Sequence, residues 1–460
     1  MMVMRQFSTP RRVRNIFNNP LSRRSQSTIK SRSTNKSSSL RNPSSSTKRV
    51  STESRNQQLR SYRYSSSPSS SRSRSRSHTR PKSLKRDSSS SRESSLSQKT
   101  SSESLVRKRL KSTSSLTSRS TNSFSLLNSA PIKESDTIVC RRGIQNSGNT
   151  CFLNSAVQSL SHTKLLRHYF LKHSFSKCDI SESFSMLLKK LWTSDTRATN
   201  ALSLKRAVSK KSPQFRGYSQ HDAAEFMQSL LDGLHNELNR VKKKPPYHEI
   251  KDIDGELISE TSRRWLDYHI QRDDSIVYDL FGFQLHSSLT CKSCGHVSSS
   301  FDMSCILPVE IPSRFGKVSI QTCLNAFFGK ERIHEMKCNG CKRQSSGYKQ
   351  LSFFSTPDIL VLQLKRFGAS GRSKLNTSVS FPINEVFPVD KWVDSHSTFS
   401  KSTSYRLRSV ISHSGSLQFG HYTAYARGTD DNWYHFNDER CSSSHYSGGS
   451  SAYVLIFERV

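Results

Sequence analysis

Hydrophobic periodicity divides this chain of 460 residues into two unequal parts. Residues 1–139 consist largely of Ser, Arg, Thr and Asn, and no apolar spacing repeats along them. Such a segment buries too little apolar surface to offset the entropy lost on ordering, so we predict that it is disordered. From Cys140 onward apolar residues recur regularly, and residues 140–460 are predicted to form one large domain or a domain with an insertion.

The first clear helix follows a turn-forming run at 146–150. Apolar residues at helical spacing continue from there to Leu160. This spacing predicts a helix that begins at Cys151, with Asn149 or Thr150 as its N-cap.

The other predicted elements fall into two groups along the chain. Helical spacing continues over 161–176, 184–192 and 219–241, and Ser219 with Asp222 gives the last of these a start that resembles a capping box. Beyond about residue 280 strand-like runs take over, at 358–367, 405–413, 421–427, 433–437 and 452–459. Helices followed by antiparallel strands predict an α+β domain.

The formal net charge of +37 is concentrated toward the N-terminus. Residues 1–140 hold 30 Lys and Arg against 6 Asp and Glu, and the other residues hold 42 against 29. The tail contains an Arg-Ser repeat at 71–77 and a basic cluster at 107–111. Two interpretations stay open: a solvated linker with phosphorylation sites, or a segment for nuclear import or weak nucleic-acid contact.

Composition also indicates the cellular compartment in which the chain is found. Ten cysteines occur without a credible secretory signal, which favours a reducing environment over a disulfide scaffold. No apolar run approaches the roughly 18 residues of a membrane span. The Arg-rich start loosely fits an organelle transit peptide, but Pro10 and Pro20 interrupt any amphipathic helix there. We expect a monomer located in the nucleus, the cytoplasm or both.

A candidate nucleophilic site combines three distant segments. Backbone N–H groups at a helix start favour a thiolate, so the pKa of Cys151 is predicted to lie below the free value of about 8.5. His421 opens a strand, and a hairpin could place Asn437 opposite it, giving a Cys-His-Asn arrangement. Asn146, on the turn before Cys151, could donate to an oxyanion. The residues alone also allow an inert buried cysteine and a structural histidine.

A metal site is indicated more strongly. Two C-x-x-C pairs, separated by 43 residues, supply Cys291, Cys294, Cys338 and Cys341. Four thiolates suit tetrahedral zinc and leave no open position, so the predicted zinc ion is structural. The alternative is four free thiols in a metal-free finger.

Six sequence boxes, in one order, together resemble the ubiquitin-specific proteases: GIQNSGNTCFLN, SQHDAAEF, the two C-x-x-C pairs, LQLKRF, GHYTAYAR and WYHFND. The resemblance covers about residues 142–459. It implies a papain-like cysteine peptidase with a helical thumb, a β-rich palm and zinc-binding β fingers at about 280–355. It also implies hydrolysis of the bond after the C-terminal glycine of ubiquitin.

The resemblance also implies roles for single residues. Cys151 would be the nucleophile, His421 the general base and Asn437 the residue that orients it. Asn146 would be the oxyanion donor and Asp438 a helper near it.

Substrate contacts are implied as well. Asp222 and Glu225 would face the basic tail of ubiquitin, although ordinary solvated helix charge is the alternative. The loop 414–420 would move aside for that tail, and Phe419 departs from the glycine that the family often has there. The expected partners are ubiquitin and ubiquitinated proteins. A ubiquitin-like modifier, a ubiquitin-binding scaffold with a degenerate site and an RNA-processing factor led by its tail stay as alternatives. Linkage preference and target proteins are not indicated.

Overall fold

The structure is a computed structural model that describes residues 140–460 except 194–195, 254, 313–315, 368–372 and 417–418. The predicted disordered tail, with its Arg-Ser repeat and basic cluster, lies outside the described residues, so its interpretations stay predictions. In the described part helices precede most strands, as the α+β prediction requires. No helix there has the length and apolarity needed to cross a membrane.

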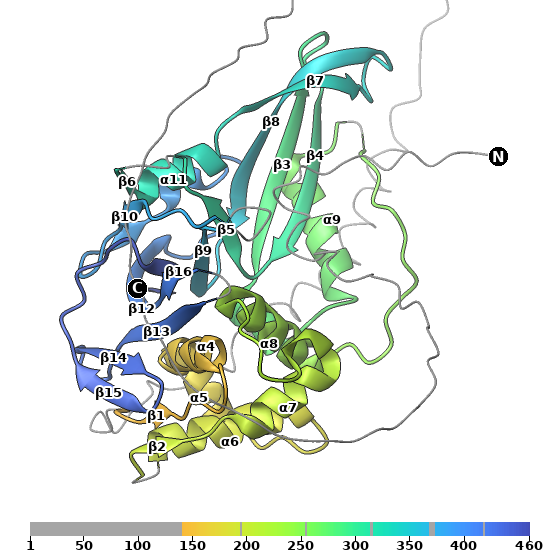
Figure 1. Cartoon of the computed structure of the whole chain (residues 1–460). Coiled ribbons are helices and arrows are strands. Elements are labelled where there is room, and N and C mark those ends of the chain that lie inside the picture. Colours follow the sequence, from red (N-terminus) through yellow and green to blue (C-terminus); the bar gives the residue numbers. More distant parts are fainter. Residues whose placement is uncertain (1–139, 194–195, 254, 313–315, 368–372, 417–418) are drawn as a thin grey trace, which may run out of the picture. The chain divides into compact units, whose positions relative to one another are not determined.

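The helical part, which we call the thumb, packs against one side of a large sheet (Figure 1). It contains α4 (Cys151–Ser161), α5 (Lys164–Lys172), α6 (Asp179–Thr193), α7 (Leu202–Lys211), the short turn η1 (Pro213–Phe215) and α8 (Ala223–Leu238). Four of these helices were predicted, whereas α7 was not, because lysine and serine dilute its apolar stripe. The predicted start of α8 at Ser219 is wrong: Asp222 is the N-cap, and its carboxylate accepts from the backbone N–H groups of Ala224 and Glu225.

The large sheet, the palm, has eight strands in the order β15-β14-β13-β12-β16-β9-β5, with β11 beside β12. Their bounds are β5 (Leu307–Glu310), β9 (Ile359–Lys365), β11 (Phe387–Pro388), β12 (Ser404–Gly415), β13 (Gly420–Arg427), β14 (Trp433–Asn437), β15 (Arg440–Ser443) and β16 (Ala452–Arg459). All pairs are antiparallel except β5 with β9. Both faces of β9 are covered: Val361 packs in the cluster with the thumb, and Leu362 packs in the cluster on the opposite side.

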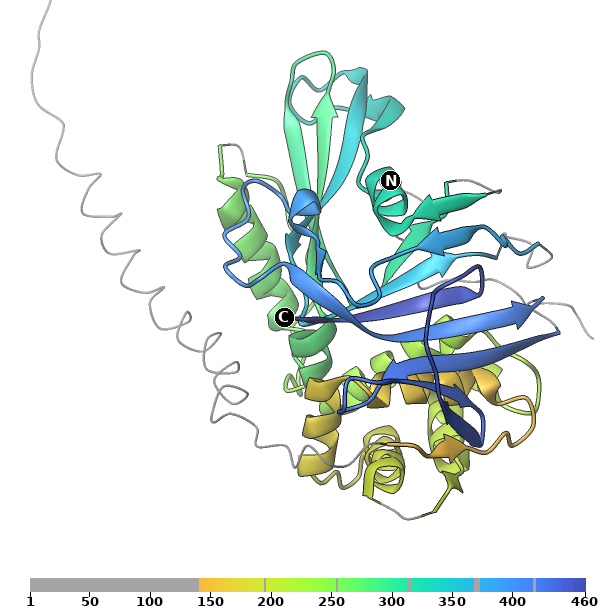
Figure 2. The ribbon, with the colours of Figure 1, turned by 90° about the vertical axis from the view of Figure 1, so that its left-hand side faces the viewer.

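The third part, the fingers, is a four-stranded antiparallel sheet at the end opposite the thumb (Figures 1 and 2). Its order is β4-β3-β8-β7, with β3 (Phe283–Cys291), β4 (Val297–Ser304), β7 (Glu331–Lys337) and β8 (Gln344–Ser355). The predicted range of about 280–355 contains these strands, but it also contains β5 and α11 (Ile320–Phe327), which pack with the palm.

Several short elements complete the described chain. The unpredicted helices α9 (Ile258–Ile270) and α10 (Ile276–Phe281) precede the fingers. Two parallel pairs join distant segments: β1 (Gly143–Ile144) with β2 (Ala198–Thr199), and β6 (Lys317–Ser319) with β10 (Ser378–Ser380). A single turn, η2 (Asp390–Trp392), follows β11.

Candidate active site and metal centre

The helix α4 begins at Cys151, as the sequence predicts. Thr150 is the N-cap, although its side chain makes no capping bond. Its backbone N–H donates instead to Oδ1 of Asn146 (3.0 Å), and Gly148 and Asn149 turn the chain with positive φ angles of 89° and 54°. The loop thereby places the Cys151 side chain, only 3% exposed, against the palm strand β13.

The environment of Cys151 contradicts the predicted lowering of its pKa. Burial raises the pKa of the thiol above its ordinary value of 9.0, and the carboxylate of Asp438 adds to this. Backbone N–H groups of Tyr422, Phe152 and Cys151 act in the opposite direction. The helix start therefore has the predicted effect, but the loss of solvation outweighs it.

The N–H donor Tyr422 directly follows His421, so the Cys151 sulfur lies at the start of β13, next to the backbone that carries the candidate base. Nε2 of His421 lies 2.8 Å from Oδ1 of Asn437. An amide oxygen can only accept, so Nε2 carries a proton, and in the neutral ring Nδ1 is the nitrogen that can accept one. The paired ladder between the two strands ends at Ala424 and Phe436, so both side chains lie beyond its last pair.

The carboxylate of Asp438 connects the α4 loop to the β14–β15 turn. Its Oδ2 accepts from Nδ2 of Asn146 (2.9 Å), and its Oδ1 accepts from Nδ2 of Asn154 (2.8 Å). Its backbone oxygen accepts from the N–H of Ile144 (2.8 Å). The same Oδ2 lies 4.0 Å from Nε2 of His421. Asp438 thus links the predicted oxyanion donor Asn146 to the turn after β14, close to His421. We call this hydrogen-bonded network the Asp438 frame.

Two residues of this frame were missed by the sequence analysis. Asn154, 2% exposed, lies one turn after Cys151 and also donates toward the carbonyl of Ile144 (3.1 Å). Gln220 accepts from the N–H of Gly420 (3.0 Å) and so fixes the start of β13 to the segment before α8. A polar residue on the buried stripe of α4 was the available signal for Asn154, whereas nothing local marks Gln220.

The glycine at 143 is required by this frame. A Cβ at that position would lie 2.2 Å from the carbonyl carbon of Glu439, in the β14–β15 turn. This close approach lets β1 lie against the turn that contains Asp438.

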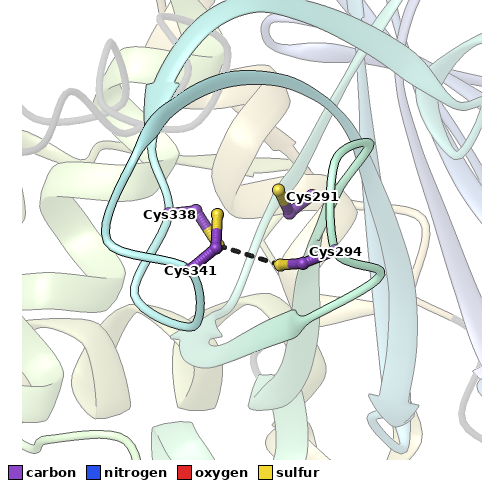
Figure 3. A group of neighbouring side chains, drawn as sticks. All are labelled: Cys291, Cys294, Cys338 and Cys341. Atoms are coloured by element: carbon purple, nitrogen blue, oxygen red, sulfur yellow. Dashed lines mark hydrogen bonds between the residues drawn. The ribbon is translucent and has the colours of Figure 1, made fainter. Parts of the chain in front are cut away.

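The four predicted cysteine ligands converge at the fingertip (Figure 3). Their sulfur atoms all lie within 4.8 Å of one another, and those of Cys294 and Cys338 are 3.6 Å apart. A tetrahedral zinc with Zn–S bonds of about 2.3 Å requires sulfur separations of about 3.8 Å. The donor set therefore fits a four-coordinate thiophilic ion. No other such group of His, Cys, Asp and Glu occurs among the described residues.

Neighbouring groups stabilise the thiolate of Cys291 and order the two knuckles. The Ser345 hydroxyl, 3.4 Å from the sulfur of Cys291, lowers the pKa of that thiol to about 6, and burial opposes it. The N–H of Gly295 bonds back to the carbonyl of Cys291 (3.0 Å), closing the first knuckle, and the N–H of Cys338 donates to the carbonyl of Arg343 (3.1 Å) in the second.

Comparison with known proteins places this geometry in a family. The model of the ubiquitin carboxyl-terminal hydrolase family matches residues 142–457. The chain belongs to this family. The resemblance to ubiquitin-specific proteases and the thumb, palm and fingers architecture are thereby confirmed.

Individual ubiquitin carboxyl-terminal hydrolases are similar over the same region. Human ubiquitin carboxyl-terminal hydrolase 2 is 36% identical in an alignment of 339 residues that covers 69% of this chain and 54% of that protein. Human ubiquitin carboxyl-terminal hydrolase 21 is 34% identical in an alignment of 350 residues that covers 69% of this chain and 61% of that protein. The chain thus matches only a little over half the length of these relatives.

A solved structure shares the fold. The SAGA Ubp8/Sgf11/Sus1/Sgf73 DUB module bound to ubiquitin aldehyde contains a chain that matches with a TM-score of 0.56 and 24% identity. The match covers 72% of each chain.

Two acids predicted to contact substrate have different surroundings in this member of the family. Asp222 is half-buried, caps α8 and accepts from the hydroxyl of Tyr453. Glu225 is exposed on the first turn of the same helix. Burial raises the pKa of both carboxyls, and Asp222 raises that of Glu225 further. The structure thus gives Asp222 a structural role, and it leaves Glu225 accessible.

Alanine substitutions are expected to separate the structural role of Asp222 from a substrate-contacting role of Glu225. We expect Asp222→Ala to lower the free energy of unfolding by about 2–4 kcal/mol, because it removes a cap and leaves the buried Tyr453 hydroxyl, which still accepts from Nε2 of Gln363 (2.9 Å), without an acceptor for its own proton. Glu225→Ala is expected to change stability by less than about 0.5 kcal/mol and to raise KM for a ubiquitin substrate several-fold. Thermal unfolding and steady-state kinetics of both variants check this. Equal stability of the two variants would contradict the capping role.

Proposed function

We propose that this chain is a cysteine-type deubiquitinase that hydrolyses the peptide or isopeptide bond after the C-terminal glycine of ubiquitin. The observations that carry the proposal are the Cys151 sulfur at the backbone N–H of Tyr422, the residue after His421, and the His421 ring at 2.8 Å from Oδ1 of Asn437, in a chain of this family.

The first step follows from the protonation states. The raised pKa keeps Cys151 a neutral thiol at neutral pH. The sulfur attacks the carbonyl carbon of the terminal glycine while its proton moves to Nδ1 of His421. Asn437 accepts from Nε2–H and keeps the ring in the orientation and tautomer that this transfer requires.

Negative charge then develops on the carbonyl oxygen. Nδ2 of Asn146 has two hydrogens, and its bond to Asp438 uses one of them. We assign the other to the oxyanion. Asp438 and Asn154 hold Asn146 in place from the α4 side.

Collapse of this intermediate releases the amine, which takes the proton from His421 and leaves a thioester on Cys151. A water molecule then attacks the thioester carbonyl after giving a proton to His421. The thiol is regenerated when that proton returns to the departing sulfur, and ubiquitin leaves as a carboxylate after its new carboxylic acid loses the second proton of the water to solvent.

If Cys151 rests as a neutral thiol, its rate of alkylation depends steeply on pH. Because burial raises its pKa, the thiolate fraction of Cys151 is small at neutral pH and increases as the pH rises. The rate of inactivation by iodoacetamide is therefore expected to rise roughly tenfold per pH unit until the pH approaches the raised pKa, with no plateau below about pH 9. A plateau at pH 5–6 would indicate a preformed thiolate–imidazolium pair and contradict this prediction.

We propose that the four fingertip cysteines hold zinc. The fit of the sulfur separations supports this, and a closed Cys₄ set assigns the ion a structural role, with no part in the reaction. Bound zinc would tie the β3–β4 and β7–β8 turns together.

The deciding experiment uses ubiquitin with an electrophile at its C-terminus. We expect the wild-type chain to form one covalent adduct, mapped by peptide mass spectrometry to Cys151. A scaffold with a degenerate site would bind ubiquitin without forming an adduct. Parallel probes built on ubiquitin-like modifiers distinguish those substrates.

Location and assembly belong to the same proposal. We propose a monomer that acts on ubiquitinated proteins in the nucleus, the cytoplasm or both, with the basic tail making weak nucleic-acid contacts. The charge of the tail supports this part. Imaging of the tagged full chain and of a variant without residues 1–139 tests the role of the tail in location.

A further inference from the structure

The excess positive charge of this chain extends beyond the tail into the thumb. Residues 141–216 hold 14 Lys and Arg against 3 Asp and Glu, whereas residues 217–460 hold 28 against 26. The palm and fingers are therefore close to neutral. Nearly all of the net charge of +37 lies in the tail and in the segment that forms α4–α7.

Two thumb helices present cations on a shared face. Their exposed residues follow the four-residue spacing of a helix face: Glu182, Met186 and Lys190 on α6, and Leu202, Arg206 and Lys210 on α7. The ion pair between Lys210 and Asp179 joins the end of α7 to the start of α6. The two helices pack against each other and run antiparallel, and this ion pair joins exposed residues of the two.

We call Lys190, Arg206, Lys210 and Lys211 the α6–α7 basic face. Of these, only Lys210 has an ion-pair partner among the described residues. Lys190, Arg206 and Lys211 are exposed and make no ion pair within 4 Å there, although the charge of Lys211 also acts on Asp179; the acids on the face are Asp179 and Glu182. Such an excess repels itself unless it is solvated or meets an anionic partner.

The surrounding chain adds to this charge. Arg197 is exposed in the connection between the two helices. The basic tail joins the domain at Cys140, and Arg142 donates to the carbonyl of Leu191 near the end of α6 (2.9 Å). The described chain therefore begins beside the same helix.

The exposed side chains of the α6–α7 basic face indicate which class of partner it can bind. Among the described residues of 141–216 the exposed large apolar side chains are Met186 and Leu202, and neither is aromatic. Protein hot spots and membrane-surface helices depend on aromatic or extensive apolar anchors. Contacts to nucleic-acid phosphates need only well-spaced Lys and Arg side chains.

We propose that the α6–α7 basic face binds the phosphate backbone of double-stranded nucleic acid without sequence preference. The folded domain then contributes contacts of its own, in addition to any that the tail makes. The face lies at the end of the domain opposite the fingers (Figures 1 and 2), and the proposal does not depend on peptidase activity.

The test uses the full chain, so that the tail is present in every sample. Fluorescence anisotropy measures binding to random-sequence duplexes of DNA and of RNA over a range of salt concentrations. In the variant Lys190→Gln/Arg206→Gln/Lys211→Gln we expect about tenfold weaker binding at physiological salt. The slope of log K against log salt should become shallower by about 2 to 3, because three phosphate contacts are lost.

Two further variants make the result specific. Lys317→Gln/Lys330→Gln/Lys391→Gln removes the same charge from exposed positions outside the thumb and should change affinity less than about twofold. Glu182→Gln removes an acid from the α6–α7 basic face and should strengthen binding a few-fold. Thermal unfolding and hydrolysis of a ubiquitin reporter should be unchanged in all three, and Glu182→Gln still decides the question if the triple thumb variant does not fold.

Three outcomes would overturn the proposal. The first is an equal loss of affinity in the thumb and control triple variants, because binding would then follow net charge alone. The second is a salt slope unchanged by the thumb substitutions. The third is a thumb-specific loss of binding to polyglutamate, or to vesicles of phosphatidylcholine and phosphatidylserine, with duplex binding retained, which would assign the face to an acidic protein or a membrane.

Discussion

Replacing Cys151 by alanine is expected to reduce hydrolysis of a ubiquitin C-terminal amide by roughly 10⁴-fold or more, because no other group in the site can form the thioester. The remaining parts, including the Asn146 donor and the His421–Asn437 pair, cannot substitute for the nucleophile, since their roles depend on it. Release of a fluorophore from the ubiquitin C-terminus measures the rate, and adduct formation with the electrophilic probe should also disappear.

The matched control is Cys178→Ala. Cys178 is a half-exposed free thiol just before α6, outside the site. Its removal should leave the rate and the adduct unchanged. Because alanine is smaller than cysteine and α4 is otherwise intact, Cys151→Ala should still bind ubiquitin. Measurable turnover by Cys151→Ala above the level of the solvent reaction would refute the assignment of the nucleophile.

The elements that sequence periodicity predicted well are those whose burial is one-sided or whose ends are marked. The strand 433–437 coincides with β14, and the helix start at Cys151 is confirmed, because turn residues stop abruptly before an apolar stripe. The amphipathic helix α7 was missed because its buried stripe is short and diluted by lysine. In β9 both faces are buried, so an alternating pattern described only one of its two packing surfaces.

The candidate site was predictable as far as single residues have distinctive chemistry. Cysteine, histidine and asparagine in marked places drew attention to Cys151, His421 and Asn437. The supporting bonds were not predictable, because Asn154 and Asp438 are 284 positions apart and only the fold brings them to 2.8 Å. The pKa of Cys151 was mispredicted for the same reason: the helix start is local and visible in sequence, whereas the burial that outweighs it comes from tertiary packing.

Loss of one fingertip cysteine is expected to have the largest structural effect. Cys291→Ser replaces a buried residue of the proposed zinc site, the last residue of β3, and oxygen is a poor substitute for thiolate sulfur toward zinc. In small zinc domains the apparent free energy of zinc binding is about 10–16 kcal/mol, and most of it stabilises the folded state. We therefore expect zinc content, measured by elemental mass spectrometry after dialysis against a weak chelator, to fall from about one ion per wild-type chain to near none.

The structural consequence should be confined to the fingers. Near the tip, β3 and β8 pair through Cys291 and Gly347, and the bond between Cys338 and Arg343 closes the other turn. Without the ion these turns lose their common anchor, so amide hydrogen exchange should become fast around 286–296 and 336–349. The core of the palm, in β12 and β16, should keep its protection because its packing does not involve the tip.

Cys178→Ser is the matched control for the fingers, since it makes the same chemical change at a thiol outside the metal centre. It should retain zinc and wild-type exchange throughout. Stripping zinc from the wild-type chain with a strong chelator should reproduce the pattern of Cys291→Ser, and adding zinc back should reverse it only in the wild type. If the metal-free wild-type fingers kept full protection, the four sulfurs would be held together by the sheet alone, and the ion would have no structural role.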